Sequence, residues 1–144
     1  MFRSILVGVY PEHDDEADAC IRMAMRLLEE GGKLVLVSVV DRPEGPTFFP
    51  ALENEEEIKA AVQHLERALT VLVRKQVPLG IDVDSIVRVG QPGKRLVAES
   101  GERQSDLVIV FEHEHLWPLS RDTVNYLLSH AGCPVLVLPQ QTHV

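Results

Sequence analysis

Residues 107–138 read LVIVFEHEHLWPLSRDTVNYLLSHAGCPVLVL, and this stretch decides the fold of the chain. It begins and ends with short, almost unbroken apolar runs, Leu107–Val110 and Val135–Leu138. Such runs are typical of strands that are covered on both faces of a parallel sheet, where alternation is not required. Between them the sequence predicts a helix over Asp122–His130, with Gly132 as its stop. A strand, a helix and a second strand in about thirty residues form a βαβ unit.

Three further helices are expected before this unit. The first should be capped by Asp14 or Asp15, carry an apolar stripe over residues 17–28 and stop at Gly31-Gly32. The second is the longest, and it opens on the capping-box spacing of Asn54 and Glu57. The third begins at Pro92, which suits a first helical turn, and runs to about Ser100. The strands expected beside them are Ser4–Tyr10, Lys33–Val40 and the alternating, edge-like Ile81–Val89.

The regular alternation of strands and helices predicts the fold class. It indicates an α/β protein with an open, doubly wound, five-stranded parallel sheet and helices on both faces. The crossover connections should be right-handed. In such sheets a ligand binds beyond the carboxyl ends of the strands, where the strand order reverses. A functional site is therefore expected near the ends of the first and fourth strands.

The composition favours a single domain over residues 1–144, without a nucleic-acid or membrane partner. Of 144 residues, 45% are hydrophobic and 25% charged, and the formal net charge is −8. An acidic chain lacks the concentrated basic face that nucleic acids and anionic lipids attract. No apolar run approaches the roughly 18 residues of a membrane span, and the N-terminal segment lacks the features of a signal peptide. The expected location is the cytoplasm, with Cys20 and Cys133 as small buried thiols.

Sequence motifs of catalysis are absent. The chain has no GxSxG elbow, no HExxH helix and no GxxxxGK[ST] loop. The stretch Gly90-Gln-Pro-Gly-Lys94 lacks the spacing of a phosphate loop and is interpreted as a turn. Ser120 is interpreted as a helix cap and not as a nucleophile. The sequence therefore predicts no enzymatic activity.

One loop carries a possible metal site. In an extended chain, His113 and His115 of the string Glu112-His113-Glu114-His115 point to the same side and could chelate a transition metal. His13, Asp14 or Asp15 could complete the site if the first and fourth strands are neighbours. The competing interpretation is a solvated polar loop. Phe48-Phe49-Pro50, in the loop after the second strand, could likewise cover the crevice or contact a partner.

The chain resembles the universal stress protein family. The matching pieces are ILVGV, KLVLVSVVD, VRVGQPGKRLV, SDLVIV and LLSHAGCPVLVLP, which occur in the family's order over nearly the whole chain. The resemblance implies the strand order 3-2-1-4-5. It also implies a homodimer in which the last strands of two subunits pair antiparallel, here through Val135, Leu136, Val137 and Leu138.

The chain departs from the ATP-binding pattern of many family members. That pattern is a glycine, two residues, a glycine, nine residues, then a glycine with serine or threonine. Here Phe111 and Glu114 stand for the first two glycines, Arg121-Asp122 for the final pair, and Tyr10 for an aspartate near the adenosine. Acidic residues in this stretch would also repel a triphosphate. The positions that still match the family's nucleotide pocket are Val9, Tyr10, Val40, Gly90, Pro92 and Phe111.

The expected function follows from the resemblance and these departures. It is that of a stress-response regulatory protein that acts as a homodimer through protein contacts, without a cofactor, enzymatic activity or bound ATP. Two alternatives stay open. The crevice at the ends of the first and fourth strands could bind a nucleotide or another small molecule, or His113 and His115 could bind a metal.

Overall fold

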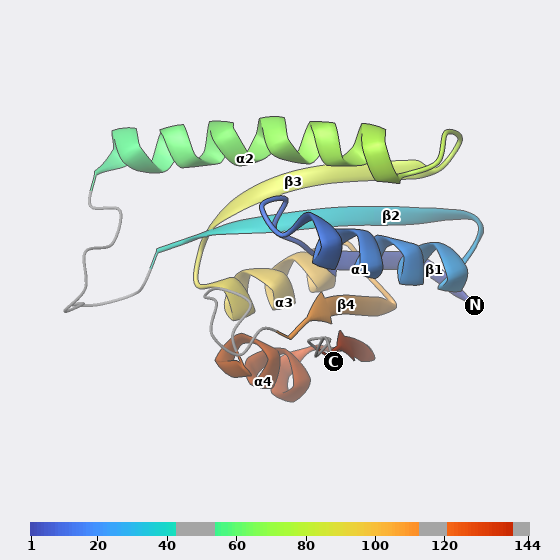
Figure 1. Cartoon of the computed structure of the whole chain (residues 1–144). Coiled ribbons are helices and arrows are strands. Elements are labelled where there is room, and N and C mark those ends of the chain that lie inside the picture. Colours follow the sequence, from blue (N-terminus) through green and yellow to red (C-terminus); the bar gives the residue numbers. More distant parts are fainter. Residues whose placement is uncertain (43–53, 113–120, 140–144) are drawn as a thin grey trace, which may run out of the picture.

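The computed structural model describes residues 1–42, 54–112 and 121–139. Within these residues, helices and strands alternate strictly along the chain (Figure 1). The expectations for Phe48-Phe49-Pro50, His113, His115 and Ser120 fall outside them. The elements are β1 (Phe2–Gly8), α1 (Asp14–Leu27), β2 (Leu28–Asp41), α2 (Glu55–Gln76), β3 (Asp82–Gly90), α3 (Pro92–Glu102), β4 (Leu107–Phe111), α4 (Arg121–His130) and β5 (Val135–Leu138).

The five strands form one parallel sheet in the order β3-β2-β1-β4-β5. This confirms the predicted α/β class, the parallel sheet and the strand order that the resemblance implied. The helices cover both faces, with α1 and α2 on one side and α3 and α4 on the other (Figure 1). No helix among the described residues is long and apolar enough to cross a membrane.

Two apolar layers hold the helices on the sheet, because successive strand residues face opposite sides. Ile5 faces the α1–α2 layer and its neighbour Leu6 faces the α3–α4 layer; both are fully buried. Strand β4 and the second half of β1, from Ile5 to Gly8, are thus covered on both faces, as their apolar sequences predict. The side chains of β5 are only half-buried, because this strand lies at the edge of the sheet and, among the described residues, pairs with β4 alone. Full coverage of Val135–Leu138 was therefore a wrong expectation.

The first helix differs most from its prediction. It ends at Leu27, because Leu28 is already extended (φ −74°, ψ 130°) and begins β2. A Cβ at Gly32 would lie 2.9 Å from the carbonyl oxygen of Arg3 on β1, so this glycine permits a close approach of two backbones and does not end a helix. The register of β1 on β2 shifts at this place, between Phe2 and Ser4.

The helix caps and the cysteines follow the predictions in part. Asn54 accepts a hydrogen bond from the Glu57 amide at 2.8 Å, which confirms the predicted start of α2. Asp14 does not cap α1; its carboxylate instead accepts hydrogen bonds from two α2 side chains, Lys75 at 3.2 Å and Gln76 at 3.0 Å. Asp15 likewise lies within the first turn, and the side chain of the N-cap residue makes no capping hydrogen bond. Of the two thiols, Cys20 is buried as predicted, whereas Cys133 beside the edge strand is half-buried.

Candidate functional site

The strand order places the candidate site at the carboxyl ends of β1, β2 and β4. The chain runs outward from β1 to β2 and β3, and then returns to the other side of β1 for β4 and β5. The order therefore reverses between β1 and β4, where open α/β sheets form a crevice. The side chains that follow these strand ends determine what the crevice could bind.

Tyr10, two residues after β1, turns toward β2. Its hydroxyl donates a hydrogen bond to the Val39 carbonyl at 2.6 Å and accepts one from the Val39 amide at 3.3 Å. Burial, together with the nearby carboxylates of Asp41 and Glu12, raises the pKa of Tyr10 far above its ordinary value. The phenol is therefore a neutral group that joins the end of β1 to the end of β2.

The backbone next to Tyr10 is also hydrogen-bonded to β2. The Val9 amide donates to the Val37 carbonyl at 2.9 Å, and the buried Ser38 hydroxyl donates to the Val9 carbonyl at 2.5 Å. Val9 and Phe111 line a tight space under Tyr10, at the ends of β1 and β4. The sequence-predicted pocket residues from these two strands are thus brought together.

Two hollows lie on either side of this strand-end layer. The hollow on the α2 side has a volume of about 240 Å³ and is lined by Tyr10, Glu12, His13, Val39, Val40, Asp41, Ala61, His64 and Leu65. The hollow on the α3–α4 side has a volume of about 270 Å³ and is lined by Asp41, Gln91, Pro92, Gly93, Lys94, Asp122, Thr123 and Tyr126. Val40 and Pro92, both predicted pocket positions, therefore belong to different hollows.

Asp41 borders both hollows and is the most perturbed carboxyl of the site. Burial raises its pKa to about 6, so the group is ionised at neutral pH and becomes protonated under mildly acidic conditions. Glu12 on one side and Asp122 on the other add further negative charge. The crevice is therefore a poor electrostatic match for a polyphosphate.

The turn that leads into α3 is shaped by glycine and proline. Pro92 occupies the first turn of the helix, as predicted. Gly93 lets α3 approach α4, since a Cβ there would lie 3.0 Å from the Cβ of Tyr126. Gly90 has φ +148°, and the side chain of Arg95 packs over it. Gly90, a predicted pocket position, lines neither of the two hollows nor the tight space under Tyr10.

Of the three histidines that are candidate metal ligands, His13 lies among the described residues. This residue lies at the α2-side hollow, whereas His113 and His115 fall outside the described residues. The residues that the structure describes contain no group of three or more His, Cys, Asp or Glu side chains arranged to hold a metal ion. A site that uses the two loop histidines stays a prediction.

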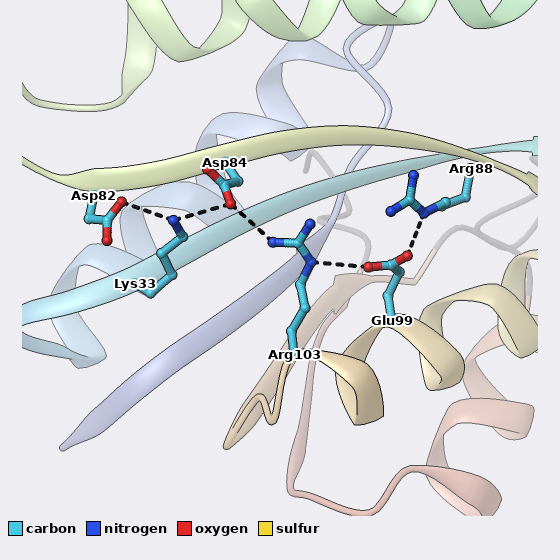
Figure 2. A network of polar contacts seen from close by, with 6 residues as sticks. All are labelled: Lys33, Asp82, Asp84, Arg88, Glu99 and Arg103. Carbon is cyan, nitrogen blue, oxygen red and sulfur yellow. Dashed lines mark hydrogen bonds and ion pairs between the residues drawn. The ribbon is translucent and has the colours of Figure 1, made fainter.

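A second polar cluster, which the sequence analysis did not single out, lies between α3 and β3. Its centre is the buried carboxylate of Glu99, whose side chain is 1% exposed. Arg88 Nε donates to one oxygen of Glu99, and Arg103 Nε donates to the other at 3.0 Å (Figure 2). Arg95 Nη2 lies 3.8 Å from the oxygen that Arg88 contacts. One carboxylate is thus the shared counter-ion of three guanidinium groups.

The cluster continues from Arg103 along the sheet. Arg103 Nη1 donates to Asp84 at 3.1 Å, and Lys33 bridges Asp84 at 3.1 Å and Asp82 at 3.0 Å (Figure 2). The row of polar residues on α3 was visible in the sequence as Arg95, Glu99 and Arg103, spaced four residues apart. Their partners on β3 and β2 are distant in sequence and become neighbours only in the fold.

Comparisons with known proteins agree with this architecture. The model of the universal stress protein family matches residues 1–139. A family protein from Burkholderia pseudomallei is 22% identical, with a TM-score of 0.68 and coverage of 96% of both chains. A family protein from Arabidopsis thaliana with AMP bound is 15% identical, with a TM-score of 0.62 and coverage of 96% of this chain and 92% of its own.

A universal stress protein from Archaeoglobus fulgidus in complex with dAMP is 19% identical, with a TM-score of 0.61 and coverage of 93% of this chain and 95% of its own. At these identities the solved structures show a shared fold. No curated protein matches the sequence. The family model, in contrast, spans almost the whole chain in a single match. The chain therefore belongs to the universal stress protein family.

Proposed function

We propose that this chain is a stress-response regulatory protein that acts as a homodimer through protein contacts, without enzymatic activity and without ATP in its crevice. Family membership supports the stress-response role. The hydrogen bonds of the Tyr10 hydroxyl to the Val39 backbone support the proposed absence of ATP from the crevice. They keep an aromatic ring at the position where the family pattern has an aspartate near the adenosine.

The electrostatics of the crevice support the same proposal. A nucleotide phosphate that entered the α3–α4 side would face Asp41 and Asp122. The adenosine part of the nucleotide would have to displace the contacts that Tyr10 makes, because the ring joins the two strand ends that border the crevice. Both effects oppose binding, and each acts on a different part of a nucleotide.

The edge strand β5 supports the homodimer. It pairs with β4 on one side only, and its four residues are aliphatic and half-buried. An open edge of this kind can add a strand from another chain. Antiparallel pairing of two β5 strands would give a symmetric interface that closes after two subunits.

Calorimetric titration of the freshly purified chain with Mg-ATP and with AMP tests the proposal. We expect no co-purified nucleotide and no micromolar binding of either nucleotide in the wild type. The variant Tyr10→Ala should gain measurable binding of AMP, because it removes the ring from the crevice. The matched variant Tyr10→Phe keeps the ring and should stay silent. Micromolar binding of either nucleotide to the wild type would overturn the proposal.

Nucleotide binding is the second candidate function. The relatives with bound AMP and dAMP favour it, and so do two hollows of about 240 and 270 Å³ at the strand ends. Under this alternative the wild type itself would bind AMP, and Tyr10→Phe would weaken that binding by freeing the ring. The same titrations therefore decide between the two functions.

A further inference from the structure

Arg88, Arg95 and Arg103 surround Glu99, but they are not equally satisfied. Arg103 donates to Glu99 and to Asp84, so two carboxylates share its charge. Arg88 donates only through Nε, to Glu99, and its two terminal nitrogens make no hydrogen bond with the described residues. A guanidinium carries five N–H donors in a planar fork, so Arg88 keeps most of its capacity to bind an acceptor.

Arg95 is less satisfied still. Its closest acidic contact, 3.8 Å to Glu99, is too long for a hydrogen bond. Its Nε is buried and has no acceptor among the described residues. The side chain is nevertheless held in place, because its stem packs over Gly90, where a Cβ would lie 2.9 Å from the Arg95 Cγ. Buried donors without an acceptor are rare in folded proteins, and a bound ion is one of their explanations.

The two under-satisfied guanidiniums lie at the same end of the cluster. Both approach the same oxygen of Glu99, and their side chains are 37% and 35% exposed, so solvent reaches them. At the other end, Lys33 is shared by two carboxylates, Asp82 and Asp84. Positive charge is therefore in excess where Arg88 and Arg95 meet, on a chain whose formal net charge is −8.

We propose that Arg88 and Arg95 form a binding site for an oxyanion of the phosphate class, either free phosphate or the phosphate group of a small monoester. Two guanidinium forks match the several oxygens of such a group and can bind it through paired hydrogen bonds. The bound oxyanion would give acceptors to the terminal nitrogens of both arginines. It would also compensate the charge that Glu99 shares among three cations.

Calorimetric titration of the whole chain with sodium phosphate tests this site, with sodium chloride of equal ionic strength as the reference. We expect saturable binding of phosphate to the wild type. Arg95→Gln should weaken it by at least about tenfold, because a paired charge-assisted contact is lost. Since the Arg95 side chain makes no hydrogen bond within the described chain, this variant should fold normally. Arg95→Lys keeps the charge but not the fork and should fall between the two.

The matched control is Arg22→Gln on α1, where Arg22 pairs with Asp18 in an exposed contact at 3.1 Å. It removes the same charge from a distant surface and should leave phosphate binding unchanged. Equal heats from chloride and phosphate, or equal phosphate binding by the wild type and Arg95→Gln, would overturn the inference.

Titration with AMP separates the two sources of the phosphate group and keeps this inference distinct from the proposed function. If the site binds a phosphate group wherever it comes from, AMP will bind as phosphate does and will be weakened equally by Arg95→Gln. Tight AMP binding that Arg95→Gln leaves intact would place the nucleotide in the crevice and overturn the proposed function. The phosphate titrations would then still decide the oxyanion site.

Discussion

The two edges of the sheet, β3 and β5, are built in opposite ways. Strand β5 presents the four aliphatic residues Val135–Leu138, with no charge to oppose another strand. Strand β3 places charged side chains at alternate positions, including Asp82, Asp84 and Arg88. Both strands have one neighbour in the sheet, so both leave one backbone edge open within the described chain.

This difference indicates which edge of the sheet can pair with a second copy of the chain. Charged side chains on an edge strand discourage the addition of a further strand, whereas an uncharged, β-branched edge invites it. On β3 the charges are also tied into ion pairs with α3 and β2 (Figure 2). A partner strand would have to disturb this network. The β5 edge offers no such obstacle, so the two edges have different roles.

The largest expected effect comes from the centre of the β3 network. Glu99→Gln removes a buried negative charge and leaves Arg88 and Arg103 without their shared counter-ion. Breaking a buried ion pair on one side costs about 3–5 kcal/mol. We therefore expect the free energy of unfolding, measured by denaturant titration, to fall by about that amount. The control Glu102→Gln, on an exposed position of the same helix, should change it by less than about 0.5 kcal/mol.

Acid pH should reproduce part of the loss in the free energy of unfolding that Glu99→Gln causes. Burial alone would raise the pKa of Glu99, but hydrogen bonds from Arg88 and Arg103 hold it below its ordinary value. A carboxyl whose pKa is lowered by folding stabilises the protein fully above its ordinary pKa, and this contribution disappears as the pH falls. Unfolding titrations from pH 6 to pH 3 should therefore show a smaller decline for Glu99→Gln than for the wild type. Parallel declines would contradict the assignment.

The next largest effect concerns β5. Val137→Asp places a charge in the middle of the proposed dimer interface and should raise the dissociation constant by at least about 100-fold, or about 2.7 kcal/mol. Sedimentation analysis should then find monomers, and circular dichroism should find the fold retained. The matched control is Ser85→Asp, at an exposed position of the β3 edge, which should leave the dimer intact. A soluble Val137→Asp dimer would place the interface elsewhere.

The sequence predicts the elements of both edges but not the contacts that distinguish them. The unbroken apolar run Val135–Leu138 identifies a strand. The sequence pattern does not reveal that Glu99 is buried, since one of its partners, Arg88, comes from the strand that precedes the helix. Gly31-Gly32 fails as a helix stop for a similar reason. The close approach of Arg3 that Gly32 permits is a tertiary contact, which no local pattern contains.

At the candidate site, too, the sequence predicts which strands meet but not the contacts of their side chains. The sequence brings Val9, Tyr10 and Phe111 to one crevice, because the strand order fixes where the strand ends meet. It does not predict that the Tyr10 hydroxyl bonds to the Val39 backbone, or that Asp41 borders both hollows. These features depend on side-chain directions at the ends of the strands.

The smallest expected effect lies at the outer end of the β3 network. Asp82 is 64% exposed, and Lys33 keeps its contact with Asp84 when Asp82 is neutralised. An exposed ion pair contributes about 0–1 kcal/mol and is weakened by salt. Asp82→Asn should therefore lower the free energy of unfolding by less than about 1 kcal/mol, and this loss should shrink in 1 M NaCl. A loss as large as that of Glu99→Gln would mean that the residues drawn in Figure 2 act as one cooperative unit, and that the β3 edge is rigid from end to end.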